Sequence, residues 1–520
     1  MASRIGKISA ITAGGAAVAV GLALLCFGTL AAVLWRASGS ALGAGDWAAI
    51  RFTVLQAAAS ALLSVTLAVP VARALARRRF FGRSVLITLL GAPFLVPVIV
   101  AVLGLIGVFG RSGLVNTALS AIGLPPISIY GFHGVILAHV FFNLPLAVRM
   151  ILQGWQSIPT ERFRLAAALG LRTKDILQHL ERPMLREVLP GAALVIFTLC
   201  LSSFAVALTL GGGPRATTVE LAIYQSLRFD FDLGRAALLS ATQFALCGTA
   251  VLLSLRFAKR ANFGAGLDRG AASWAGVGRF GLAQDVVAIG FATTFLIAPL
   301  SVLVVRACPG LADLPVTLLP ALARSLAVAA VSTLLTMTAA VVLAIAIRRG
   351  PGAKLLELAA MLPLAASSLV LGTGLFLIVQ PWVAAERIAL LVTALVNTTL
   401  ALPFALRILL PTVRAIEDDY GRLATSLALT GYARWRWLIA PRLQTPLGFA
   451  AGLVAALSIG DLGAVALFAG ERGVTLPLLV QRLMGSYRMD AAAAVALVLV
   501  TVSFAVFWGL DWLGRRNVDT

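Results

Sequence analysis

Long apolar runs alternate with short polar segments along the whole chain of 520 residues. A membrane-spanning helix needs about 20 mostly apolar residues, and only helices satisfy the backbone polar groups over single runs of this kind. Six such runs in the first half cover residues 12–34, 53–72, 84–108, 131–152, 188–210 and 236–256. Six more cover residues 284–305, 322–347, 355–379, 388–410, 444–468 and 491–512. The pattern predicts an all-α polytopic membrane protein with about 12 transmembrane helices.

Composition excludes the main soluble alternative. Hydrophobic residues make up 60% of the chain and charged residues only 12%, whereas a soluble domain carries about 25% charge. The net charge of +21 could indicate nucleic acid. However, the basic residues lie in short clusters between the apolar runs, which is typical of loops that face anionic lipid. Membrane lipid is therefore the expected partner of these clusters, and nucleic acid is not.

The distribution of basic residues predicts the orientation. If the N-terminus is cytoplasmic, the inside segments hold 30 of the 42 Lys and Arg residues. The positive-inside rule then places both termini in the cytoplasm. The first apolar stretch, from Ile11 to Leu34, is longer than the core of a signal peptide, about 7–15 residues. We expect it to be a retained first span.

The two halves of the chain repeat each other. Residues 144–149 read LPLAVR and residues 402–407 read LPFALR, 258 positions later. The same offset pairs Arg164 with Arg422 and Pro183 with Pro441. Two parallel six-helix repeats predict a pseudo-twofold axis along the membrane normal and a pathway between the halves. The expected organisation is a first permease half at 1–260, a cytoplasmic linker at 261–283 and a second permease half at 284–520.

A long polar loop follows the fourth span of each half. These are the first loop, residues 153–187, and the second loop, residues 411–443. The first loop is expected to be helical to Leu169, to break at Gly170, and to resume from Asp175 until Pro183 ends it. The duplication favours two equivalent docking sites for a partner. The alternative is an amphipathic helix that only packs on lipid headgroups.

The two loops resemble the EAA loop of binding-protein-dependent ABC importer permeases. That pattern is Glu-Ala-Ala, three residues, Gly, and Pro thirteen residues after the Gly. Both loops have Arg where the pattern has Glu. The resemblance implies the type I ABC importer permease fold, with ATPase-coupling helices at about 168–178 and 426–436. The coupling residues that it implies are Arg164, Leu165, Ala166, Gly170, Asp175, Pro183, Arg422, Leu423, Ala424, Ala428 and Pro441.

A closer resemblance covers nearly the whole chain. Its most specific element is GGGPRATTVELAIYQ within residues 208–237, supported by residues 137–145, 458–468 and 485–488. These segments look like those of the thiamine (and thiamine pyrophosphate) permeases of ABC transporters. The resemblance implies import of thiamine, and of thiamine phosphates, across the bacterial inner membrane by alternating access. A ferric-iron ABC permease and a proton-coupled secondary transporter remain open.

The sequence lacks the motifs of an enzyme. No GxxxxGK[ST] phosphate-binding loop occurs, so the chain is expected not to hydrolyse ATP by itself. Two copies of a separate ATP-binding cassette ATPase, which would use ATP and Mg, are implied instead. A separate periplasmic or extracytoplasmic thiamine-binding protein is also implied. The four cysteines form no CxxC pair, and the three histidines do not have metal-ligand spacing, so no cofactor or metal is expected in this chain.

Polar groups within spans are costly and often functional. The candidates for a substrate pathway or gate are Asn143, Ser203, Gln243 and Asp461. The candidates for the outer loop and binding-protein contact are Glu220, Tyr224, Asp230 and Asp232. A cationic thiazolium ring would favour negative charge and an aromatic face. Helix–helix contacts and helix caps are the alternative roles for these side chains.

Overall fold

A computed structural model describes residues 10–37, 39, 41–90, 96–211, 213, 216–257, 278–350, 352–470 and 473–516. These residues form helices and loops, and no β-strand occurs among them. Eleven of their helices are long and apolar enough to cross a membrane, and one bent pair raises the number to 12. The prediction of an all-α polytopic membrane protein is confirmed. Residues 261–277 of the expected linker lie outside the described residues, as do Gly212, Pro214 and Arg215.

Among the described residues, four of the predicted spans are divided. The third consists of α3 (Arg83–Leu89) and α4 (Val98–Phe109). The fifth consists of α9 (Arg182–Leu201) and α10 (Phe204–Leu210), separated by two serines. The ninth bends by 93° between Ala365 and Ser368. The eleventh divides at Gly460–Leu462 into α19 (Ala440–Ile459) and α20 (Gly463–Phe468). Hydropathy over a whole run does not detect these breaks, because one or two polar or small residues barely change its mean.

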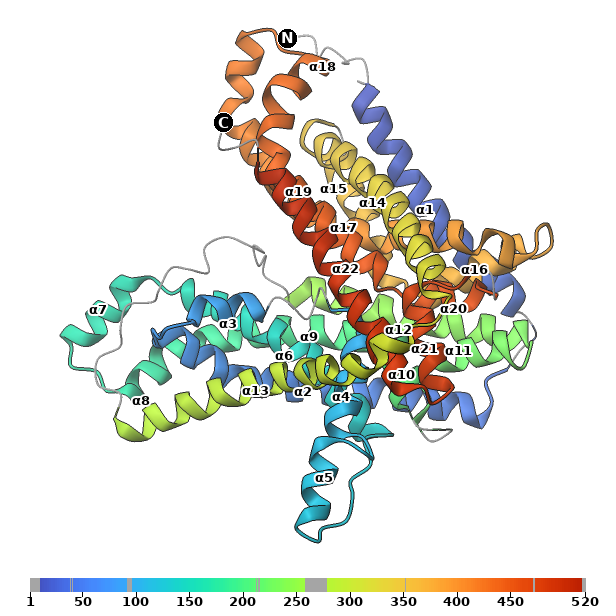
Figure 1. Cartoon of the computed structure of the whole chain (residues 1–520). Helices are drawn as coiled ribbons and strands as arrows, with labels where there is room; N and C mark the ends of the chain where they lie inside the picture. The colour runs from blue at the N-terminus through green and yellow to red at the C-terminus, as the bar shows by residue number, and fades with distance from the viewer. Residues whose placement is uncertain are drawn as a thin grey trace. The chain divides into compact units, whose positions relative to one another are not determined.

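The helices belong to two compact units, each built from separate stretches of the chain. The α2 unit comprises Gly43–Ala222 and Leu246–Ala312. In it α2 packs against α6, α9 and α13, which Figure 1 shows side by side. The unit also includes the C-terminal part of α12, from Leu246 onward. The elements are α2 (Ala44–Arg77), α3 (Arg83–Leu89), α4 (Val98–Phe109), α5 (Leu114–Ala121), α6 (Phe132–Gln156), α7 (Thr160–Ala168), α8 (Thr173–Ile176), the π-turn η2 (Leu177–Glu181), α9, α10 and α13 (Arg279–Gly310).

The α14 unit comprises Met1–Leu42, Ile223–Ala245 and Asp313–Thr520. In it α14 packs against α1, α17 and α19, and α22 packs against α19 and α21. The helices α11 and α12 and the 3-10 turn η4 belong to both units in part. The elements are α1 (Ala10–Ala37), α11 (Val219–Arg228), α12 (Leu233–Phe257), η4 (Leu311–Asp313), α14 (Leu318–Arg349), α15 (Ala353–Met361), η5 (Leu362–Ala365), α16 (Ser368–Val379), α17 (Ala385–Ser426), α18 (Gly431–Arg434), the π-turn η6 (Trp435–Ile439), α19, α20, α21 (Leu476–Gly485) and α22 (Met489–Arg515).

The first helix of each half packs in the unit of the other half. The helix α1 packs on α14 and α16, whereas α13 packs on α2 and α4. A glycine permits each close approach. A Cβ atom on Gly104 of α4 would lie 2.6 Å from the Pro299 carbonyl oxygen of α13, and one on Gly374 of α16 would collide with Thr29 of α1. The halves at 1–260 and 284–520 therefore describe a repeat along the chain and not the compact units.

The same contacts recur in the two units. The Thr53 hydroxyl of α2 accepts a hydrogen bond from the Val219 N–H at 2.9 Å. The Ser325 hydroxyl of α14 accepts one from the Leu476 N–H at 2.8 Å. The two hydroxyls are 272 positions apart along the chain. This offset aligns α2 with α14, as the offset of 258 aligns the two loops.

Candidate functional site

The first loop turns sharply after α7. The Leu171 N–H donates to the Ala166 carbonyl at 3.0 Å, and the Gly170 N–H donates to the Ala167 carbonyl at 3.1 Å. Gly170 has a φ of +65°. This pair of bonds around a left-handed residue is the Schellman motif, which satisfies the last carbonyls of a helix. The predicted break at Gly170 is confirmed.

The second loop makes the same turn without a glycine. The Leu429 N–H donates to the Ala424 carbonyl at 2.9 Å, and the Ala428 N–H donates to the Thr425 carbonyl at 3.1 Å. Ala428 has a φ of +51°. A residue with a Cβ atom is less stable in this region by about 1–2 kcal/mol. The backbone shape is therefore retained at Ala428 despite a local cost.

Each loop has its own small hydrophobic core. In the first loop, Ala166 is buried with Phe163 and Ile176, and Ile158 and Leu180 pack against them. The second loop has a core of Ile416, Ala424, Leu438 and Leu429. Three of these correspond to Ile158, Ala166 and Leu180 at the offset of 258. Both loops are thus folded helical modules, not loose connections.

Leucines are exposed at the same places on both modules. Leu165 and Leu169 are 60% and 66% exposed, and Leu423 and Leu427 are 56% and 62% exposed. Arg164 and Arg422, the positions of the EAA glutamate, are exposed too. Exposed apolar side chains with a polar surround are typical of a protein-binding surface.

The prediction that Pro183 ends the second helix of the first loop is wrong. The helix α8 begins with the Asp175 carboxylate accepting from the Arg172 N–H at 3.0 Å. It then continues through η2 into α9, with Pro183 in the first turn of α9. Pro441 lies likewise in the first turn of α19, after η6. The π-helical segment before each proline shifts the bonding from i→i−4 to i→i−5, as in the Arg182 N–H to Leu177 carbonyl bond. Proline, which has no N–H, is tolerated at this interruption of the regular helix.

Each module contains at least one partner of a buried ion pair, but the pairs differ. In the first loop, the Glu181 Oε2 atom of η2 lies 2.8 Å from the Arg73 Nε atom of α2, with Glu181 only 1% exposed. In the second loop, Arg434 pairs with Glu417 inside the module itself. The two modules therefore have the same fold but different attachments.

Asn143 lies in a buried polar node between helices. Its amide donates to the His139 carbonyl at 2.8 Å and to the Cys200 Sγ atom at 3.3 Å. The His139 ring contacts the Ser60 hydroxyl at 3.3 Å. These contacts join α6 to α9 and α2, which is the helix–helix role considered above.

The α14 unit contains an equivalent node that the sequence analysis missed. The Ser458 hydroxyl lies 2.7 Å from the Ser332 hydroxyl and 3.0 Å from the Asn397 amide. Asn397 and Ser458 correspond to His139 and Cys200 at the offset of 258. Because the paired residues differ in type, identity between the halves did not reveal them.

Asp461 lies in the break between α19 and α20. Its Oδ1 atom accepts from the Gly463 N–H at 3.3 Å, at the start of α20. A Cβ atom on Gly463 would collide with Ser368 at the start of α16. The carboxylate is therefore near the point where the breaks of the ninth and eleventh spans meet. Ser203 occupies the corresponding break before α10, and Gln243 is buried on α12.

The candidates of the loop at 211–235 lie in different settings. Glu220 is buried on α11. Tyr224 meets Phe229 edge-on with the ring centroids 5.8 Å apart. Burial raises the pKa of the Tyr224 phenol, although Arg228 and Arg482 oppose this, so the phenol is neutral at physiological pH. Asp232 accepts from the Arg235 N–H at 2.9 Å and caps α12, while Asp230 pairs with Arg235 at 3.2 Å.

Within the described part of the chain, no three His, Cys, Asp or Glu side chains are grouped so that they could hold a metal ion. The candidate site consists of the two folded loop modules, two polar side chains at helix breaks, Ser203 and Asp461, and the buried polar side chains Asn143 and Gln243.

Several curated proteins with one shared name are similar to this chain over most of its length. No family model matches the chain. The thiamine transport system permease protein ThiP of Brucella abortus (strain 2308) is 38% identical over 524 residues, covering 96% of this chain and 94% of that protein. The ThiP of Escherichia coli (strain K12) is 39% identical over 487 residues, with 91% and 90% covered. The ThiP of Haemophilus influenzae is 34% identical over 474 residues, with 88% and 87% covered.

Proposed function

The chain belongs to the family of thiamine transport system permeases, and from this premise we propose that it is the membrane-spanning subunit of an ATP-driven thiamine importer in the bacterial inner membrane. The names of its full-length relatives support thiamine as the substrate. The observation that carries the ATP-driven mechanism is the pair of docking modules with one shared fold. Two equivalent modules fit two copies of one ATPase subunit.

The exposed surface of each module would contact the ATPase. Leu165 and Leu169 in the first module, and Leu423 and Leu427 in the second, offer the apolar area. The fold of each module keeps this area rigid, because the Schellman turn and the small core fix α7 or the end of α17 against the following helix. ATP and Mg would be bound by the partner, and this chain would bind no cofactor.

Transport would follow from movement of both modules at once. Closure of the ATPase pair around ATP would draw the modules together, and the helices that continue from them, α9 and α19, would move with them. This is rigid-body alternating access. With both termini in the cytoplasm, the modules would face the ATPase, and a separate thiamine-binding protein would deliver the substrate from the other side.

The candidate pathway and outer-loop side chains suit a cationic substrate. Thiamine carries a positively charged thiazolium ring. Asp461 would supply negative charge at a helix break, and Tyr224 an aromatic face for the ring. Thiamine phosphates share the thiazolium ring, so we propose them as further substrates.

Charge placed in both turns tests the docking role. Asp tolerates the left-handed backbone region, so Gly170→Asp combined with Ala428→Asp should preserve the turns while adding charge beside the exposed leucines. The co-expressed ATPase should then be lost from a pull-down of the permease. As a matched control, Gly123→Asp alters another exposed glycine of positive φ with open space around it and should retain the ATPase. Full ATPase recovery with the double variant would refute the docking assignment.

A further inference from the structure

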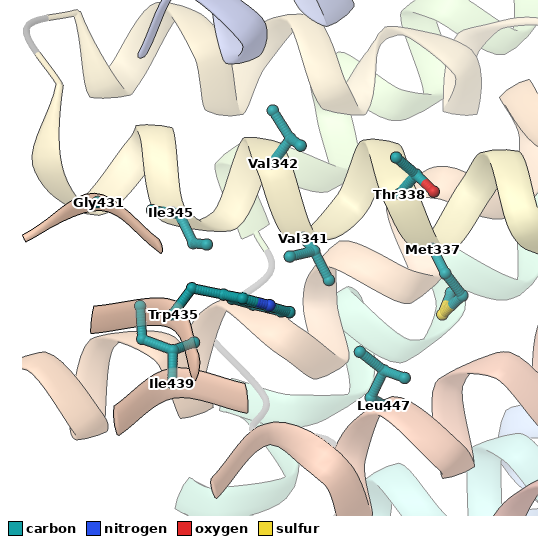
Figure 2. Close-up of a pocket in the computed structure, with 9 residues that line it drawn as sticks. All are labelled: Met337, Thr338, Val341, Val342, Ile345, Gly431, Trp435, Ile439 and Leu447. Atoms are coloured by element: carbon teal, nitrogen blue, oxygen red, sulfur yellow. The ribbon is translucent and has the colours of Figure 1, made fainter. Parts of the chain in front are cut away.

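An apolar groove of about 400 Å³ opens in the α14 unit beside the second module. Figure 2 shows Ile345, Val341 and Met337 of α14 projecting towards Trp435 of η6 and Leu447 of α19. The groove also contains Thr338, whose hydroxyl donates to the Leu334 carbonyl of its own helix at 2.7 Å. Its volume is in the range of small-molecule sites, about 300–1,000 Å³. The lining selects an apolar ligand.

The equivalent position in the α2 unit is bridged by charge. The offset of 272 relates Ile345 to Arg73, and the offset of 258 relates Ile439, at the end of η6, to Glu181. Arg73 and Glu181 form the ion pair of 2.8 Å between α2 and η2. The α14 unit has two isoleucines in their place, and these line the open groove. The groove is thus a specific difference between two otherwise similar modules.

The length of the groove along α14 is close to the hydrocarbon thickness of one leaflet. Its lining residues belong to the candidate spans Leu318–Arg348 and Gly431–Phe468. Met337 and Ile345 are eight positions apart, which is about 12 Å along a helix. One leaflet contributes about 15 Å of hydrocarbon. Because the groove starts at the second module and runs along two candidate spans, the apolar material available to fill it is the acyl chain of a lipid.

A basic side chain lies beyond the end of the groove. Arg348 follows Ile345 by three residues, which places it on the same face of α14. Its partner is Asp418 at 2.5 Å, and the two side chains are 40% and 63% exposed. An exposed ion pair contributes little to stability, so Arg348 can turn to a phosphate without a large loss.

We propose that this groove binds an acyl chain of a bilayer phospholipid, with Arg348 at the lipid phosphate. Where the first module has the buried Arg73–Glu181 pair, the second has an apolar contact between Ile345 and Ile439, and the bound lipid would extend that apolar contact along the groove. This proposal does not depend on the identity of the transported substrate or on the ATPase.

Trp435 provides a fluorescent probe inside the groove. The full-length protein would be reconstituted in nanodiscs of phospholipid with or without bromine atoms on the acyl chains, because bromine quenches a contacting indole. The chain has nine tryptophans, so the emission of Trp435 is taken as the difference between the native protein and Trp435→Phe. This difference should be several-fold smaller in brominated lipid. An equal difference in both lipids would mean that protein covers the groove, and would overturn the proposal.

Two groove variants separate binding from general exposure to the bilayer. Ile345→Arg with Ile439→Glu installs the ion pair of the α2 unit and should restore the emission of Trp435 in brominated lipid. Val341→Phe, which fills the groove without charge, should do the same and serves if the double variant does not assemble. Leu177→Trp in a Trp435→Phe background places an indole at the equivalent position of η2 and should be unquenched. Quenching that persists in the groove variants, or that is equally strong at Leu177→Trp, would overturn the proposal.

Discussion

Single backbone positions determine the turns of both modules. Gly170 and Ala428 have left-handed φ angles of +65° and +51°, but only glycine adopts this region without a steric cost. The repeat in the sequence predicts that Ala428 takes the glycine position. It does not predict that the same turn forms with alanine. The hydrogen bonds and the small core that stabilise the turn involve residues before and after Ala428.

Substitution of Ala428 by glycine and of Gly170 by alanine should have opposite effects on the stability of the two turns. Ala428→Gly should stabilise the second turn by about 1 kcal/mol, and Gly170→Ala should destabilise the first by a similar amount. Hydrogen–deuterium exchange at the Leu429 and Leu171 amides measures the local opening of each turn. Slower exchange in Gly170→Ala would show that left-handed strain is not what limits these turns.

Asp461 can be tested for charge separately from helix capping. Asparagine caps a helix about as well as aspartate, so Asp461→Asn should keep the contact to Gly463 and remove only the negative charge. We expect lower thiamine uptake with unchanged assembly of the complex. Uptake equal to that of the native protein would reduce Asp461 to a helix cap.

At the scale of the elements, the positions of the long helices could be predicted from the sequence, but the breaks in them and the contacts between them could not. The positions of long helices followed from the apolar runs, because a membrane span must be helical and about 20 residues long. The π-turns before α9 and α19 did not follow, because a proline usually marks a helix end and here marks a first turn. The polar nodes around Cys200 and Ser458 also depend on helix packing, which no local pattern specifies.

The attachment of α13 to α2 depends on a buried carboxylate. Asp285 of α13 accepts from the Nε atoms of Arg77 at 2.8 Å and Arg78 at 2.7 Å, and its side chain is 4% exposed. Asp285→Asn would leave two cations without their counter-charge. The free energy of unfolding should fall by about 3–5 kcal/mol, measured as a lower thermal midpoint in detergent.

An exposed pair gives the matched control for this loss. Asp313 pairs with Arg488 at 3.2 Å, with side chains 85% and 48% exposed. Asp313→Asn should barely change the midpoint, because exposed ion pairs contribute little. Equal midpoints for Asp285→Asn and Asp313→Asn would contradict the role of the buried cluster.

At the scale of the whole molecule, the repeat is visible in the sequence but its assembly is not. The offset of 258 identified the two modules and their equivalent prolines. The packing of α1 and α13 in the units of the opposite halves depends on contacts between residues that are far apart in the chain, such as Gly104 and Pro299. Apolar helices of similar composition offer no local signal for such a partner.

The most direct test of the central claim is uptake of labelled thiamine by cells that cannot make it. The strains would differ only in this gene, and labelled ferric iron would be measured in parallel. An ATP-driven thiamine importer should give gene-dependent thiamine uptake that collapses when ATP is depleted and persists when a protonophore is added at high ATP. Uptake of iron in place of thiamine would contradict the proposed substrate. Thiamine uptake abolished by the protonophore while ATP stays high would contradict the ATP-driven mechanism.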